Sequence, residues 1–132
     1  MPTPQEEANK AMALEAFDTL INKRDFAAAE KYWSPDYIQH SATIPPGRDA
    51  LFDMVKSMPE LRYEFGLALA SNDYVVLHGR MTGSGQPRAT IVADMLRIEN
   101  GVFAEHWDVT QPEATKAEAG GRPPMFGDSF PS

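Results

Sequence analysis

The segment from residue 89 to residue 110 constrains the fold most, because two runs of β-type residues flank the turn sequence Glu99-Asn100-Gly101. Asn-Gly between such runs is a strong signal for a β-hairpin. Before residue 60 the apolar residues recur at helical spacing, whereas from residue 61 onward they recur mostly at every second position. We therefore expect an α+β fold, with helices first and an antiparallel meander of about four strands after them.

The length of this turn sets the register of the hairpin, and two readings are open. A two-residue loop pairs Glu99 with Val102, whereas a three-residue loop, with the turn glycine as a left-handed bulge, pairs Ile98 with Val102. We favour the three-residue loop, because it also brings Arg97 and Glu105 together as a diagonal ion pair.

The register decides which side chains meet on the other face of the hairpin. The two-residue loop places Asp94 opposite Trp107, and the three-residue loop places Asp94 opposite His106, with Asp108 one step along. The favoured register gathers Asp94, His106 and Asp108 into one cluster. Apolar residues share this face: Val92, Leu96, Ile98, Val102 and Ala104. A carboxylate among apolar groups has its pKa raised and becomes a usable proton acceptor or donor.

The opposite face of the hairpin is also expected to be apolar. Its residues are Ile91, Met95, Phe103, Trp107 and Val109. An apolar surface of this kind is rarely left in water. The sequence therefore predicts a homodimer that packs sheet against sheet.

Composition limits the class of protein. A chain of 132 residues is one domain by size, which we place at residues 1–112, with a tail over residues 113–132. The net charge of −7 argues against nucleic acid as a partner, because phosphate binding needs clustered Lys and Arg. The chain has no cysteine, no run of about 18 apolar residues that would cross a membrane, and a polar, acidic start that is no secretory signal. A cytoplasmic protein is expected.

Helix signals fill the first part of the chain. Thr3 and Glu6 form a capping box that begins a first helix. Asp25 caps a short second helix, which we expect to run to Trp33. A third helix is predicted over about residues 48–58.

Strand signals follow, and one precedes the third helix. The segment 37–40 is short and extended, and alternation places Ile38 and His40 on one side of it, with Tyr37 and Gln39 on the other. We expect this segment either to stand apart or to add a strand to the meander.

Two further runs alternate before the hairpin. Every second residue from Leu61 to Leu69 is apolar, which predicts one buried face along that strand. The next strand, residues 74–82, carries His78 and Arg80 on a common face. Both runs belong to the predicted meander.

The tail is polar but carries the apolar residues Met125, Phe126 and Phe130. Its Gly and Pro content gives no regular pattern. Three readings stay open: the tail anchors over the mouth of a pocket, it anchors on a partner subunit, or it is disordered.

No motif for a metal, a cofactor or a nucleophile stands out. The chain has no Gly-rich phosphate loop, no nucleophile elbow and no helical zinc-protease motif. Its histidines His40, His78 and His106, taken with Asp94 and Asp108, lack the tight spacing of metal ligands. We expect neither metal nor cofactor, which leaves acid–base chemistry or ligand binding.

Several short sequences resemble the landmarks of one family. They are Tyr37 to His40, Pro46 to Arg48, Asp73 to His78, Asp94 to Gly101 and Glu105 to Val109. Together they are similar to the SnoaL-like, polyketide cyclase-like branch of the nuclear transport factor 2-like superfamily. The resemblance implies a cystatin-like cone, in which three N-terminal helices pack on a curved antiparallel sheet of about four to six strands.

The resemblance also implies functional residues. Asp108 matches the acid/base aspartate of the cyclases, which close a ring by aldol condensation, and Asp94 stands where they tend to carry a histidine. We expect a cofactor-free enzyme that cyclises or isomerises a small, largely apolar carbonyl compound. Asp108 would remove a proton next to the carbonyl, and Asp94 would orient or share it. His40 or His78 would donate a hydrogen bond to the enolate.

Two alternatives stay open, because one fold serves many functions. In the first, the cone holds a small hydrophobic ligand without chemistry. In the second, Asp94 and Asp108 hold a water, as an epoxide hydrolase requires. The residues expected to contact the ligand are Trp33, Tyr37, Phe52, His106 and Trp107.

Overall fold

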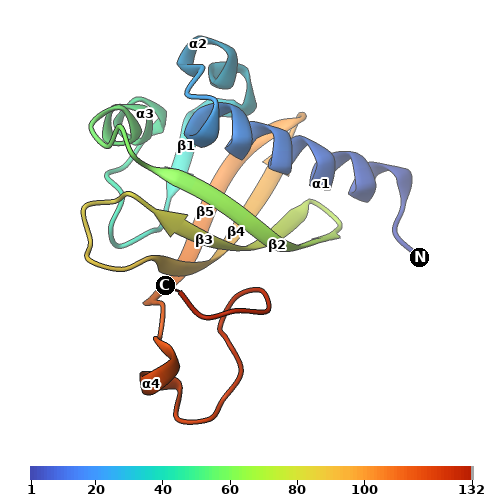
Figure 1. Cartoon of the computed structure of the whole chain (residues 1–132). Helices are drawn as coiled ribbons and strands as arrows, with labels where there is room; N and C mark the ends of the chain where they lie inside the picture. Colours follow the sequence, from blue (N-terminus) through green and yellow to red (C-terminus); the bar gives the residue numbers. More distant parts are fainter. Residues whose placement is uncertain (132) are drawn as a thin grey trace.

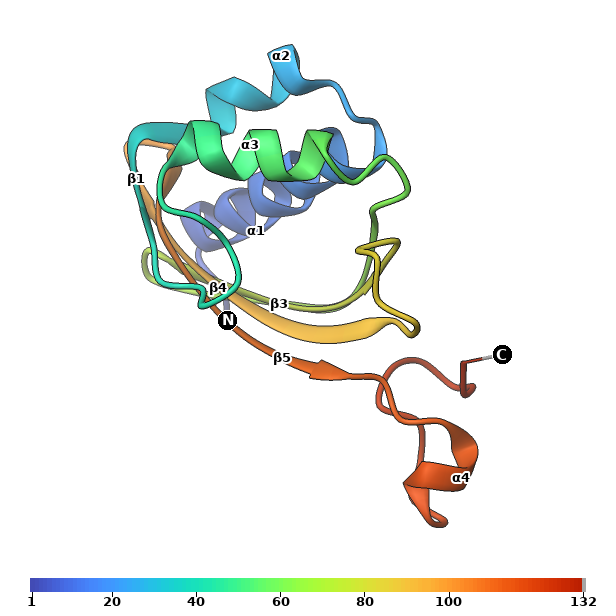
Figure 2. The same ribbon diagram turned by 90° about the vertical axis from the view of Figure 1, so that its left-hand side faces the viewer.

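The computed structural model describes residues 1–131 and forms two layers (Figures 1 and 2). Helices α1 to α3 cover the concave face of a curved five-stranded sheet. Among the described residues, no helix is both long and apolar enough to cross a membrane. The elements are α1 (Pro4–Phe17), continued by a π-helical turn (Asp18–Asn22), α2 (Phe26–Ala29), β1 (Trp33–Gln39), α3 (Arg48–Lys56), β2 (Arg62–Ser71), β3 (Tyr74–Thr82), β4 (Thr90–Glu99), β5 (Val102–Pro112) and α4 (Lys116–Ala119).

The sheet has the strand order β1-β5-β4-β3-β2. Strands β2 to β5 form the antiparallel meander that the sequence predicts. The extended segment that contains residues 37–39 adds an edge strand, β1, which pairs parallel with β5. The predicted α+β architecture is therefore confirmed, but the sheet is mixed and not wholly antiparallel.

The first two helices begin where their capping residues predict. Thr3 and Glu6 form the capping box of α1, and the Asp25 side chain accepts a backbone hydrogen bond at the start of α2. The second helix ends earlier than predicted, since Trp33 is already the first residue of β1. Pro35 keeps Ser34 extended, because a proline disfavours helical geometry in the residue before it, and Trp33 belongs to the same extended run.

The β4–β5 turn follows neither predicted reading in full. Asn100 and Gly101 form a two-residue turn with φ of 53° and 78°, so Glu99 pairs with Val102. Positive φ at both positions is what a tight hairpin turn needs, and Asn-Gly tolerates it best. The favoured three-residue loop is therefore wrong. A bulge at Ala104 then shifts the pairing of the strands beyond the turn.

The bulge at Ala104 decides which β5 side chains face the helices. Before it, Ile98 pairs with Phe103; after it, Arg97 pairs with Glu105. Phe103 is therefore fully buried in the core and not on the outer face, as the sequence had predicted. Arg97 and Glu105 do form the predicted ion pair, at 2.8 Å, although they lie directly opposite and not diagonally.

A second bulge reverses the sides of β2. The pairing with β3 shifts at Gly66, so the alternation does not keep one face buried along the strand. Leu67 and Leu69 are 63% and 60% exposed, and Ala68 and Ala70 pack against the core in their place. The predicted single apolar face of this strand is wrong beyond the bulge.

The described part of the tail is ordered on the convex side of the sheet. The carboxylate of Glu113 is completely buried and accepts two hydrogen bonds from Arg80 of β3, at 2.9 and 2.6 Å. The same guanidinium lies 4.8 Å from the centre of the Phe126 ring. These contacts hold the tail beyond the end of β5, on the face opposite the helices (Figure 2).

Candidate functional site

A cavity of about 40 Å³ lies between the helices and the concave face of the sheet. This is more than the roughly 10–15 Å³ that one water needs. The residues of its wall are apolar except for Asp94, His106, Tyr37 and Trp33, which carry polar groups. An apolar hollow with a few convergent polar groups is the usual form of a small-molecule site.

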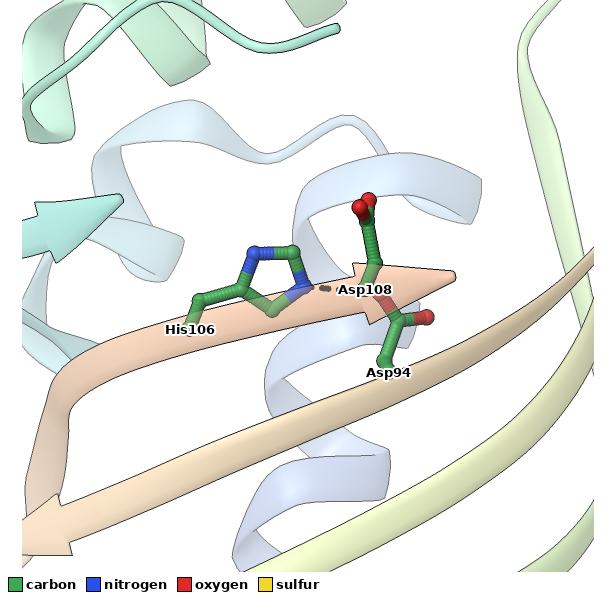
Figure 3. A group of neighbouring side chains, drawn as sticks. All are labelled: Asp94, His106 and Asp108. Carbon is green, nitrogen blue, oxygen red and sulfur yellow. Dashed lines mark hydrogen bonds and ion pairs between the residues drawn. The ribbon is translucent and has the colours of Figure 1, made fainter. Parts of the chain in front are cut away.

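Three ionisable side chains converge beside this cavity (Figure 3). Asp94 of β4 lies directly opposite Asp108 of β5, and atoms of Asp94, His106 and Asp108 lie within 4.8 Å of one another. The three side chains gather as the sequence predicted, because the bulge returns the even-numbered residues of both strands to one face. The partner opposite Asp94 is nevertheless Asp108, where His106 was expected.

Asp94 is almost completely buried, with 4% of its surface exposed, as is His106 with 3%. Its Oδ1 lies 2.7 Å from His106 Nε2, and its Oδ2 accepts a hydrogen bond from the Tyr63 hydroxyl at 3.1 Å. Burial raises the pKa of Asp94, although the His106 contact opposes the shift; the Asp108 charge adds to it. A buried carboxyl of this kind retains its proton more readily than an exposed one.

Asp108 is only half-buried, and one of its oxygens is free. Its Oδ2 accepts a hydrogen bond from the Ser41 hydroxyl at 2.9 Å. Its Oδ1 has no hydrogen-bond partner among residues 1–131. Of the two facing carboxyl groups, Asp108 is therefore the one with an oxygen free of hydrogen bonds within the described residues, although it stands beside the cavity and is not part of its lining.

The cluster also meets the distances of a metal site. However, both ring nitrogens of His106 and both oxygens of Asp94 already make hydrogen bonds inside the protein. For His106 to bind a metal ion, one of its two ring-nitrogen hydrogen bonds would have to be displaced.

His40 lies on the opposite face of the sheet from this cluster. Its Nε2 is 2.6 Å from Glu105 Oε2, and its ring stacks on Trp107 at 4.8 Å. The predicted placement of His40 and Trp107 at the cavity is therefore wrong. Alternation along β1 is the reason, because His40 follows Gln39, whose side chain contacts His106 on the concave side.

Besides Asp108, which stands beside the cavity, two more predicted residues are not part of its lining: His78 and Phe52. His78 is on the convex face of β3, with its ring 5.6 Å from Phe126 of the tail. Phe52 packs edge-on against Trp33 at 5.4 Å, behind the cavity wall. Trp33 and Tyr37 do line the cavity, as predicted.

Three polar residues at the site were not predicted: Gln39, Ser41 and Tyr63. Gln39 and Ser41 hold His106 and Asp108, and Tyr63 holds Asp94. Only Gln39 carried a sequence signal, because it shares a strand face with Tyr37. Ser41 and Tyr63 reach the site through contacts with residues 67 and 31 positions away.

Comparisons with solved structures give the same fold. AclR of Streptomyces galilaeus, a candidate hydroxylase, is 25% identical over 80% of this chain and 90% of its own, with a TM-score of 0.65. A candidate ketosteroid isomerase from Kribbella flavida is 17% identical over 96% and 97%, with a TM-score of 0.74. A candidate polyketide cyclase from Bacillus cereus is 16% identical over 83% and 79%, with a TM-score of 0.69. The last two show the fold alone.

Sequence similarity identifies the family more directly. No curated protein is significantly similar to the chain. The family model of the SnoaL-like domain, however, matches residues 14–106. This span runs from α1 to His106 and so includes all the residues that line the cavity, although it stops short of Asp108. With a match over more than half of its length and the same α+β architecture, the chain belongs to the SnoaL-like family.

Proposed function

We propose that this SnoaL-like protein is a cofactor-independent acid/base enzyme that acts on a small, largely apolar carbonyl compound. The observation that carries the proposal is the direct opposition of Asp94 and Asp108 beside an apolar cavity. Two neighbouring carboxyl groups do not ionise together easily, so one holds a proton while the other is free to accept one. Burial raises the pKa of Asp94, which makes Asp94 the protonated partner and Asp108 the base.

The reaction begins with transfer of a proton from the carbon next to the carbonyl to Asp108 Oδ1. The C–H electron pair becomes the enolate, whose oxygen carries the negative charge. The enolate then takes a proton back at another carbon, which is an isomerisation, or its carbon attacks a second carbonyl of the same molecule, and the alkoxide so formed takes the proton from Asp108, which completes an aldol ring closure. Both outcomes conserve atoms and electrons and need no added oxidant or reductant.

Proton exchange in D₂O tests this proposal without knowledge of the natural substrate. Small cyclic ketones incubated with the protein should gain deuterium next to the carbonyl, as followed by ¹H NMR. Asp108→Asn keeps the shape and removes the base, so exchange should fall about 10²- to 10⁴-fold. Asp49→Asn, at a side chain that is 95% exposed, serves as the matched control. Equal exchange by the parent and Asp108→Asn would refute the role of Asp108.

A non-catalytic binder is the second candidate, because the buried aromatic rings of Trp33 and Tyr37 line the cavity. Ketones that raise the melting temperature yet gain no deuterium would favour it.

An epoxide hydrolase is the third candidate, since the free oxygen of Asp108 offers a place for a water. Diol formation from small epoxides, detected by mass, would favour that activity.

We also propose a homodimer that packs through the convex face of the sheet. Leu67, Leu69, Val76 and Val109 are between 37% and 66% exposed on its strands. Phe103 does not contribute, since it lies in the core. An apolar patch of this kind is typical of an interface. Light scattering at micromolar concentration should give twice the monomer mass, and a monomer mass would contradict the dimer.

A further inference from the structure

The acid/base proposal needs a hydrogen-bond donor for the enolate oxygen, and neither His40 nor His78 lies at the cavity. Strand β1 carries a side chain that can act as this donor. Tyr37 and Gln39 lie on the same side of this strand, and Tyr37 lines the cavity together with Asp94 and His106. The hydrogen bonds of Gln39 determine where each of the neighbouring protons points.

The orientation of the Gln39 amide is fixed by a backbone group. The Ser41 N–H donates to one amide atom of Gln39 at 2.9 Å. A backbone N–H is always a donor, so that atom must be the oxygen Oε1. The other amide atom is therefore the nitrogen Nε2, which donates to the Tyr37 hydroxyl oxygen at 3.0 Å.

The same amide oxygen fixes a proton on His106. Oε1 of Gln39 lies 2.7 Å from His106 Nδ1, and an amide oxygen can only accept. His106 Nδ1 must therefore carry a hydrogen. A single further proton then lies between His106 Nε2 and Asp94 Oδ1, which are 2.7 Å apart.

The Tyr37 hydroxyl proton has no acceptor in the described part of the chain. Its oxygen receives the Gln39 N–H, and the buried Trp33 N–H approaches the same oxygen without reaching hydrogen-bond geometry. Because donors approach the oxygen, its own hydrogen must point elsewhere. Burial raises the pKa of Tyr37, and the charges of Asp94 and Asp108 add to the rise. The hydroxyl therefore keeps its proton at neutral pH.

We propose that Tyr37 donates a hydrogen bond to the oxygen of the ligand, and that Gln39 is the positioning residue that keeps the Tyr37 proton available. This assignment rests on the proposed function for its enolate, but the ligand needs only an accepting oxygen beside an apolar body. It makes a ketone preferable to a hydrocarbon of the same shape. The orientation of Gln39 also leaves one proton for Asp94 and His106 to share, because it fixes the other imidazole proton on Nδ1.

The first experiment reads the protons of His106 directly in the ligand-free protein. ¹⁵N-histidine NMR should show His106 Nδ1 protonated, with the resonances of His40 and His78 as internal comparisons. An unprotonated Nδ1 on His106 would overturn the assignment of Gln39. This measurement needs no variant and no activity.

The second experiment measures the affinities of cyclohexanone and methylenecyclohexane by NMR titration. The two probes have nearly the same shape, and only the ketone accepts a hydrogen bond. The ratio of the two affinities is measured in each variant and divided by the ratio in the parent. The difference in hydration between the two probes is the same in both ratios and therefore cancels. Tyr37→Phe should lower the preference for the ketone about three- to tenfold. Tyr32→Phe, at a buried tyrosine outside the cavity wall, should leave it unchanged.

Gln39→Glu separates positioning from packing. A carboxylate at this position accepts the Tyr37 proton and draws it away from the ligand. The ketone preference should therefore fall as in Tyr37→Phe, and the double variant should show no further loss. Additive losses, or an unchanged preference in Tyr37→Phe, would overturn the proposal. If neither probe binds, the proposed function itself is contradicted, and the His106 resonances still decide the role of Gln39.

Discussion

The two faces of the sheet each carry a histidine paired with a carboxylate, but their environments differ. On the concave face His106 Nε2 lies 2.7 Å from Asp94, and both side chains are almost completely buried. On the convex face His40 Nε2 lies 2.6 Å from Glu105, and the His40 side chain is 41% exposed. Nearly equal distances thus occur in a buried pair and in a pair that is partly exposed to solvent.

The pKa shifts of the two carboxyl groups run in opposite directions. Burial raises the pKa of Asp94. Hydrogen bonds from Arg97 first, and His40 second, lower the pKa of Glu105. Desolvation penalises the charged form, whereas a cation in water stabilises it. The contact with a histidine alone therefore does not set the direction of the pKa shift; burial does.

The largest contrast between the faces is expected from a charge placed on each. Leu77→Asp puts a carboxylate at a fully buried concave position, and the protein should fail to fold because an unpaired charge is not tolerated there. Leu69→Asp, on the convex face, should leave the fold intact and convert the proposed dimer to a monomer. Circular dichroism and light scattering measure both effects. A folded Leu77→Asp, or a dimeric Leu69→Asp, would contradict the assignment of that face.

A smaller contrast is expected from removing each histidine. His106→Leu leaves the buried Asp94 carboxyl without its main partner and should reduce the free energy of unfolding by about 3 kcal/mol. His40→Leu removes an exposed pair and should change the urea midpoint little. Equal losses in the two variants would show that burial does not distinguish the pairs.

The smallest effect is a difference in pH dependence. The folded-state pKa of Asp94 is raised above its usual 3.8, so its contribution to stability is complete below that pH and is lost as the pH rises through the folded value. The folded-state pKa of Glu105 is lowered below its usual 4.5, so its contribution is present above that pH and is lost as the pH falls through the folded value.

Urea unfolding from about pH 3 to 7 measures this difference. The free energy of unfolding of the parent should exceed that of Asp94→Asn by less as the pH rises. It should exceed that of Glu105→Gln by less as the pH falls. If both stability differences changed with pH in the same direction, the opposite pKa shifts of Asp94 and Glu105 would be contradicted.

The sequence predicted the elements well because their signals are local. The Asn-Gly turn, the capping residues and the alternating strands each depend on neighbours within a few positions. The two bulges were missed, because Gly66 and Ala104 are set by which side chains fit the core after the strands have paired. Phe103 illustrates this, since it leaves its expected face to pack edge-on against Trp33 at 5.0 Å.

The site was predicted in part for the same reason. Asp94, His106 and Asp108 lie on one hairpin, so their gathering follows from strand alternation alone. His40 was misplaced although the alternation already put it opposite Tyr37 and Gln39. Its true neighbour, Glu105, depends on the parallel pairing of β1 with β5, which no local pattern reveals.

The extra residue at Ala104 has a consequence for how such a protein could change. If the bulge closed, so that Ala104 paired with Arg97 and no residue were lost, every β5 side chain beyond it would turn to the opposite side. Trp107 would then enter the hollow in place of His106, and Glu105 would be driven inward while the imidazole moved out into solvent. A one-residue slip in the pairing would in this way erase the proposed proton-transfer chemistry while keeping every strand, so the hairpin offers evolution an abrupt exchange of chemistry and not a gradual one.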